Sequence, residues 1–252
     1  MSIILGINTH HNGSVALICD GKVKSAIQAE RISRVKRQPL PLERDIKLTA
    51  KCVHYCLDAA DFEYSDIEAI ALCTPQKLTK INDLDLFRYI GGIPKKYAET
   101  FYVPHHFSHM EYIAHYGNLE PGIILIIDGS GSLEEDRLFF NVREKYHSKV
   151  IDYIQFGGKE VISAYWFDGQ KSSLIYRFSP SWLTFDKSNQ DGGLLGQSIG
   201  HYWEWASLYC CGSRDKAGKV MGLAAFGEKD QIDKEEIISI SDTGKVNVDY
   251  KR

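Results

Sequence analysis

The sequence predicts an α/β protein that has mixed sheets with flanking helices and is built from two related halves. Short apolar runs with period-two alternation lie between turn-forming residues, which is typical of strands. Longer stretches carry apolar residues at helical spacing. A polar or glycine turn between two apolar strands occurs near residues 3–28 and again near 123–156. We therefore expect a pseudo-repeat with a boundary near residues 118–121.

The first half is expected to contain one sheet and two helices. Strands are predicted, in order, at residues 2–7, 14–19, 22–28, 67–73 and 101–104. The pair Asp20-Gly21 is a tight-hairpin signal between the second and third of them. A helix is predicted over 42–60, because Ile46, Ala50, Val53 and Leu57 share one face, and another over 106–115.

The second half is expected to begin with a strong buried strand at 123–127, followed by a glycine turn at 128–132. Further strands are predicted at 138–142, 150–156, 161–167 and 173–178, with a helix over 196–209 and a helix or loop junction at 219–226. Residues 1–119 would form one subdomain and 120–252 a second, partial one. Two such halves are the layout of the actin-like ATPase (ASKHA) superfold, in which backbone N–H groups of both turns approach nucleotide phosphates.

Composition narrows the function classes. The chain has 252 residues, 44% of them hydrophobic and 25% charged, as in ordinary soluble globular proteins. The net charge of −3 gives no general attraction to nucleic acid, although it leaves a nucleic-acid partner open. No apolar run approaches the ~20 residues that cross a membrane, and no signal peptide is present. The cytoplasm is therefore the expected compartment.

The cysteines indicate core positions rather than disulfides. No pair has Cys-x-x-Cys spacing, and Cys19 and Cys73 lie inside apolar segments, where small buried residues are expected. Cys52 and Cys56 are one helical turn apart. Burial is the commoner reason for such a pair, and a metal site is the less favoured alternative.

One cluster of histidines predicts a metal site. His105 and His109 are four residues apart, which places both imidazoles on one helical face. Asp128 ends an apolar strand and enters a glycine turn, so its carboxylate should emerge there. Two nitrogens and one hard oxygen would suit iron, manganese or zinc better than calcium. For His106 we prefer a packing or N-cap role.

Several motifs occur in a fixed order along the chain. They are Ile4-Leu5-Gly6-Ile7-Asn8 with His11-Asn12-Gly13-Ser14, then Glu30-Arg31-Ile32-Ser33-Arg34-Val35-Lys36, then His105-His106-Phe107-Ser108-His109, then Asp128-Gly129-Ser130-Gly131, and finally Gly218-Lys219-Val220-Met221-Gly222-Leu223-Ala224. In these motifs the chain resembles the N-terminal part of the O-carbamoyltransferases that act on antibiotics and nodulation factors. It is also similar to the tRNA threonylcarbamoyl-transfer proteins, but the second and last motifs favour the O-carbamoyl branch.

The resemblance implies specific roles. The metal ligands would be His105, His109 and Asp128, holding Fe²⁺ or another divalent transition metal. Lys36 would bind the carbamoyl-adenylate intermediate and stabilise the charge that grows during transfer. The nucleotide contacts, for ATP or carbamoyl-adenylate, would come from Asn12, Lys36, Asp128, Gly129, Ser130, Gly131 and Lys219. His201 and Lys219 are weaker candidates than the others.

A histidine in the first turn is the candidate general base. His11 would take the proton of the acceptor hydroxyl, since imidazole titrates near neutral pH. The adjacent His10 is the alternative base, in which case His11 would be an ordinary turn residue. The alternative for Lys36 is an ordinary surface lysine without a catalytic role. The implied reaction moves a carbamoyl group from its adenylate to a hydroxyl of a small molecule or modified nucleotide.

The chain also departs from the family. Asn12 stands where Asp is usual, and Ala225-Phe226 where Pro-Tyr is usual. Family members are much longer and carry a domain that makes carbamoyl-adenylate from carbamoyl phosphate and ATP. We therefore expect a fragment, a subunit of a split enzyme, or a protein of reduced size with a different function. The formation of carbamoyl-adenylate would be supplied by a further domain or subunit. A tRNA threonylcarbamoyl-type component and a non-catalytic metal- or nucleotide-binding subunit stay open as alternatives.

Overall fold

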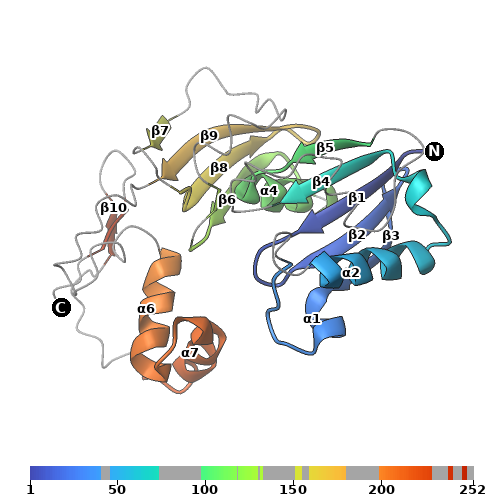
Figure 1. Ribbon diagram of the computed structural model, residues 1–252. Coiled ribbons are helices and arrows are strands. Elements are labelled where there is room, and N and C mark those ends of the chain that lie inside the picture. Colours follow the sequence, from blue (N-terminus) through green and yellow to red (C-terminus); the bar gives the residue numbers. More distant parts are fainter. Residues whose placement is uncertain are drawn as a thin grey trace. The chain divides into compact units, whose positions relative to one another are not determined.

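The computed structural model describes residues 1–40, 46–73, 98–117, 119–129, 131–132, 151–154, 159–179, 199–228, 238–240 and 246–248. These residues form sheets and helices of a mixed α/β protein (Figure 1). The chain divides into two compact units, and the division in the first part of the sequence falls between Ser108 and His109. Because this division lies inside one helix, the predicted subdomains 1–119 and 120–252 stay a prediction.

The first unit contains a five-stranded sheet. Its strands are β1 (Ile3–Asn8), β2 (Ser14–Cys19), β3 (Lys22–Gln28), β4 (Ala69–Cys73) and β5 (Glu99–Tyr102). Their order is β3-β2-β1-β4-β5, with β1, β2 and β3 antiparallel and β4 and β5 parallel to β1. The five strands predicted in this half are confirmed, as is the hairpin at Asp20-Gly21, where both residues have positive φ.

Helix α2 (Ile46–Asp58) covers β2 and β3 and closes the core of this unit (Figure 1). Strands β1, β2 and β4 alternate buried and half-buried positions, so that Ile3, Leu5 and Ile7 lie in the core. Cys52 and Cys56 are completely buried. The pKa of Cys52 is raised to about 11, mainly by this burial and secondarily by the neighbouring Cys56. This burial agrees with the core role expected for both residues.

Three further elements belong to this unit or begin in it. The short helix α1 (Ala29–Ser33) and the 3-10 turn η1 (Tyr64–Asp66) were not expected from the pattern. Helix α4 (His105–Tyr116) confirms the helix predicted over 106–115 and extends it by one residue at each end. Its first four residues belong to the first unit and the rest to the second.

The second unit contains a four-stranded sheet of β6 (Gly122–Ile127), β8 (Ile162–Phe167), β9 (Ser172–Ser179) and β7 (Ile151–Ile154), in that order. Strands β6, β8 and β9 are successively antiparallel, as β1, β2 and β3 are, and both middle strands carry a register shift. The second copy of the repeat was expected near 123–156, yet β6 pairs with β8 at 162–167. Local periodicity cannot show which later strand becomes the partner. The strand predicted at 138–142 lies outside the described residues.

Strand β6 is buried on one face only, which corrects the expectation of a fully buried strand. Ile124 and Ile126 are buried, whereas Ile123 is 65% and Leu125 is 55% exposed. An unbroken apolar run predicts burial on both faces, as in parallel sheets. Here the strand is antiparallel to β8 and packs like a strand of a one-sided sheet.

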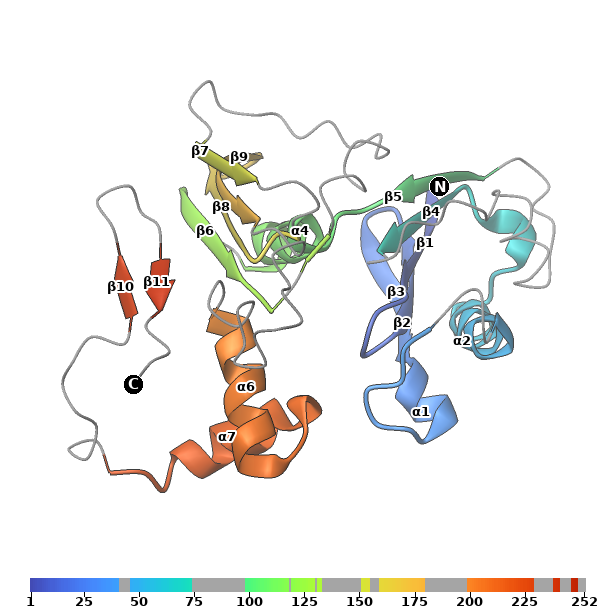
Figure 2. The ribbon, with the colours of Figure 1, turned by 60° about the vertical axis from the view of Figure 1, so that its left-hand side comes forward.

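Three elements pack against one another after the second sheet (Figure 2). They are helix α6 (Ile199–Cys211), helix α7 (Ala217–Ala224) and the 3-10 turn η4 (Arg214–Lys216) between them. Gly212, with φ of 66°, ends α6 in the left-handed conformation that favours glycine. Strands β10 (Ile238–Ile240) and β11 (Val246–Val248) form a short antiparallel pair that the sequence pattern did not predict. Among the described helices, none has both the length and the apolar character that a membrane span requires.

Candidate metal and nucleotide site

The carboxyl edge of the parallel strands in the first unit gathers polar side chains. Strand β1 ends at Asn8, two residues before His10, and β4 ends at Cys73, which lies opposite Asn8 in the ladder. The backbone N–H of Thr9 donates to the Cys73 carbonyl at 3.0 Å. Helix α4 begins at His105 shortly after β5, and the ring centroids of His10 and His105 are 5.9 Å apart. Carboxyl ends of parallel strands are the usual location of ligand sites in such sheets.

Helix α4 and the end of β6 bring the three predicted metal ligands together. One ligand atom from each of His105, His109 and Asp128 lies within 4.8 Å of the others. Two of these residues are half-buried and His109 is exposed. His106, by contrast, is completely buried, as expected for a packing role.

The donor set fits a divalent transition metal. Nitrogen and oxygen ligands lie about 2.1 Å from such an ion, so that neighbouring donors stand roughly 3 Å apart. The three donor atoms lie within 4.8 Å of one another, which is near this spacing. Three protein ligands leave coordination positions open, and two imidazoles with one carboxylate suit Fe²⁺, Mn²⁺ or Zn²⁺. The ion itself stays a prediction.

Asp128 is held by its own turn. Its backbone N–H donates to the Val161 carbonyl at 2.9 Å, and its Oδ1 accepts the N–H of Gly129 at 2.6 Å. The turn packs against the start of α6, where a Cβ on Gly200 would stand 2.7 Å from the carbonyl carbon of Asp128. A glycine at position 200 is therefore required for this contact. The carboxylate oxygen of Glu204 also lies beside Gly129.

The predicted phosphate role of the glycine turn is not directly visible. The N–H of Gly129 donates to Asp128, and that of Gly131 donates to the Glu160 carbonyl at 2.7 Å. Ser130 lies outside the described residues. Contact of these amides with a phosphate stays a prediction, and it requires the amides to exchange partners.

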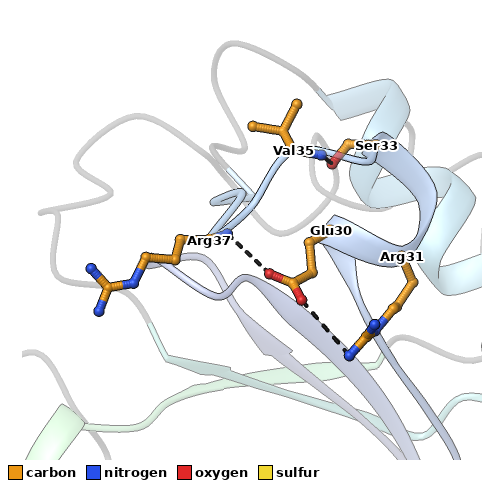
Figure 3. Close-up of polar contacts among 5 residues, drawn as sticks. All are labelled: Glu30, Arg31, Ser33, Val35 and Arg37. Carbon is orange, nitrogen blue, oxygen red and sulfur yellow. Dashed lines mark hydrogen bonds and ion pairs between the residues drawn. The ribbon is translucent and has the colours of Figure 1, made fainter. Parts of the chain in front are cut away.

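The first turn is joined to the segment that carries Lys36. Asn12 N–H donates to the Arg37 carbonyl at 3.3 Å, and Gly13 N–H donates to the Gln38 carbonyl at 2.9 Å. Glu30 organises the same segment, because its carboxylate accepts the backbone N–H of Arg37 at 3.0 Å and pairs with Arg31 at 3.8 Å (Figure 3). The motifs around His11 and Lys36 therefore share one backbone hydrogen-bond network, and both side chains are exposed.

Backbone strain concentrates in these two segments. Asn12, Arg34 and Arg37 have φ of 59°, 61° and 60°. Asn tolerates this left-handed conformation, whereas an arginine there costs about 1–2 kcal/mol. Strain of this kind persists where the surrounding structure fixes the chain, and it marks candidate functional segments.

Both candidate bases lie in the first turn. The His10 and His11 rings have centroids 4.2 Å apart, and the His11 Nδ1 lies 3.0 Å from the Asn12 Nδ2. His10 is half-buried and faces His105, whereas His11 is exposed. The geometry keeps both histidines as candidates.

Lys219 and His201 lie on helices of the second unit, in α7 and α6, and Lys219 is exposed.

Two residues near the histidines were missed by the sequence reasoning. Cys73 is half-buried at a strand end rather than in the core, and its Sγ lies 3.8 Å from His105 Nδ1. Ser108 lies 3.9 Å from the same sulfur. The signal that was available was the position of Cys73 at the end of an apolar run.

Known proteins to which the chain is similar include a sequence relative and a structural likeness. No family model matches the chain. The chain is 29% identical over 142 residues to the nodulation protein NolNO of Sinorhizobium fredii (strain NBRC 101917 / NGR234), and the match covers 48% of this chain. It spans only 20% of the length of NolNO. The similarity to this nodulation protein agrees with the family resemblance of the sequence motifs.

The structural likeness is weaker. YeaZ from Pseudomonas aeruginosa superimposes with a TM-score of 0.34 and 14% identity, over 69% of this chain and 68% of that chain. At this level the superposition carries no argument about fold or function.

Proposed function

We propose that the chain is the N-terminal catalytic part of a metal-assisted O-carbamoyltransferase with an actin-like fold. The observation that carries the proposal is the convergence of His105, His109 and Asp128, which come from two motifs of the family signature. The similarity to NolNO supports the same class. The shared network of the first turn and the Lys36 segment adds a second pair of signature motifs that meet in space.

The reaction breaks a mixed anhydride. The acceptor hydroxyl oxygen attacks the carbamoyl carbon of carbamoyl-adenylate, and the bond from that carbon to the phosphate oxygen breaks. AMP leaves with the electron pair of that bond, and the hydroxyl proton passes to a base. The products are an O-carbamoyl ester of the acceptor and AMP.

The side chains divide this work. His11, or His10 beside it, takes the proton from the acceptor hydroxyl. Lys36 faces the adenylate and stabilises the negative charge on the departing phosphate. His105, His109 and Asp128 would hold a divalent metal ion, which would supply Lewis-acid polarisation of the carbamoyl carbonyl. Asn12 and Lys219, together with the glycine turn after Asp128, would contact the nucleotide.

Carbamoyl-adenylate has to reach this site from elsewhere. The matched region spans only 20% of NolNO. In the family that the motifs resemble, a separate domain makes the adenylate. We therefore assign its formation from carbamoyl phosphate and ATP to a further domain or subunit. The hydroxyl acceptor is a small molecule or a modified nucleotide.

A transfer assay tests the proposal. The purified chain is incubated with carbamoyl phosphate, ATP and a panel of hydroxylated acceptors, with and without the protein encoded next to it. We expect an acceptor that gains one carbamoyl group, measured by mass spectrometry. Asp128→Asn should reduce the transfer at least about 100-fold, because the metal loses a charged ligand. Asp61→Asn, the same change at an exposed turn, should leave the rate unchanged.

Two other outcomes would contradict the proposal. Tight binding of tRNA without carbamoyl transfer would favour the threonylcarbamoyl-type component. Metal binding without nucleotide binding or transfer in any combination would favour the non-catalytic subunit.

A further inference from the structure

The Cys73 thiol lies beside the candidate metal ligand His105, and any role for it there rests on the proposed metal site. The thiol stands at the carboxyl end of β4, in the same edge as the start of α4. It contacts two residues of the first helical turn, His105 Nδ1 at 3.8 Å and Ser108 Oγ at 3.9 Å. His105 and Ser108 belong to one motif of the family signature, whereas Cys73 belongs to none.

The surroundings of the thiol allow its sulfur to act as an acceptor toward His105. The Ser108 hydroxyl donates its proton to the carbonyl of His105 at 2.7 Å, so that its oxygen is available to accept the thiol proton. With its proton directed to Ser108, the sulfur can accept a proton that His105 carries on Nδ1.

We infer that the Cys73 thiol selects the Nδ1–H tautomer of His105 and thereby presents Nε2 to a divalent metal ion. A ligating histidine usually donates its second N–H to an acceptor, which fixes both the tautomer and the ring orientation. Carboxylates and carbonyls are the common acceptors, and a thiol sulfur is a weak one. Thr9 holds the strand end in place, because its backbone N–H and hydroxyl both donate to the Cys73 carbonyl.

Imidazole ¹⁵N NMR of the metal-free protein tests the tautomer directly, at a pH where His105 is neutral. We expect the Nδ1–H pattern for His105 in the unsubstituted chain and in Cys73→Ser, whose hydroxyl keeps one donor and one acceptor. Cys73→Ala should lose that pattern. Cys19→Ala, a buried cysteine of the same sheet, should keep it.

Co²⁺ affinity, followed by its visible absorption, provides the second measurement. Cys73→Ala should bind about tenfold more weakly than the unsubstituted chain, at the low end of losses for outer-shell partners, and Cys73→Ser should recover most of the affinity. An Nε2–H pattern in the unsubstituted chain, or equal tautomers and affinities in all variants, would overturn the inference. If the unsubstituted chain binds no Co²⁺, the proposed metal site fails, and the NMR pattern still decides the role of Cys73.

Discussion

At the scale of single residues, two backbone positions support the segments of the candidate site. At one of them a Cβ would overlap the neighbouring backbone, and at the other a non-glycine residue adopts the left-handed conformation. Gly200 brings the start of α6 against the backbone of Asp128 and Gly129. Arg34 ends α1 in the left-handed conformation, with its N–H donating to the Glu30 carbonyl at 3.0 Å. Each position gives a test in which backbone geometry is changed without removing a predicted ligand.

Gly200→Ala should damage the site by displacing Asp128. The added Cβ would overlap the turn backbone, and overpacking of this kind costs about 1–3 kcal/mol. The midpoint temperature of thermal unfolding and the affinity for the metal ion should both fall. Gly222→Ala is the matched control, because a Cβ there meets nothing within 4 Å and alanine favours the helix. Equal stability of the two variants would show that α6 does not pack on this turn.

Arg34→Gly should stabilise the first unit. Glycine adopts the left-handed conformation without the penalty of about 1–2 kcal/mol that a larger residue has, although it also gains entropy in the unfolded chain. We expect a net gain of up to about 1 kcal/mol in the free energy of unfolding, measured by urea titration. Arg34→Ala removes the same charge but keeps the strained backbone, so it should show no gain.

At the scale of elements, the β8–β9 hairpin shows how one carboxylate closes a turn. Asp168 Oδ1 accepts the N–H of Gln170 at 2.8 Å and that of Lys171 at 2.7 Å, and Gly169 has φ of 98°. The two backbone donors, first Lys171 and then Gln170, hold the pKa of Asp168 below its usual value. This hairpin is the counterpart of the Asp20-Gly21 hairpin in the first unit.

The lowered pKa has a defined effect on stability. Because the folded-state pKa is below the unfolded value of about 3.9, the contribution of Asp168 is present above that pH. It is lost as the pH falls through the folded-state pKa. Asp168→Ala should therefore lower the thermal midpoint at neutral pH, with a smaller difference in strong acid. A difference that stays constant down to the lowest pH would contradict this account, and Glu120→Ala, at an exposed carboxylate, provides the control.

Elements could be predicted well where the pattern was local. The strands and hairpin of the first sheet and the two helices of this half follow from alternation, helical spacing and the Asp20-Gly21 signal. Pairing could not be predicted in the same way. The partner of β6 is determined by contacts between residues far apart in the sequence, which local periodicity does not reveal. Helix α1 and strand β10 are too short to show a periodic pattern.

At the scale of the whole molecule, the sequence predicted which side chains would form the candidate site better than it predicted how they are supported. His105 and His109 follow from helical spacing, and Asp128 from its place at a strand end. The close approach at Gly200 and the role of Cys73 depend on packing between segments far apart in sequence. Such contacts leave no local signature, so only the structure reveals them.

Metal content is the measurement that tests the central claim most directly. The chain is loaded with Fe²⁺ under anaerobic conditions, passed through a desalting column, and analysed for iron per chain. We predict one ion for the unsubstituted protein and for His115→Ala, a change on the exposed end of the same helix. His109→Ala should retain almost none, since affinity should fall at least about 100-fold. Equal iron in all three proteins, or none in the unsubstituted chain, would contradict the account.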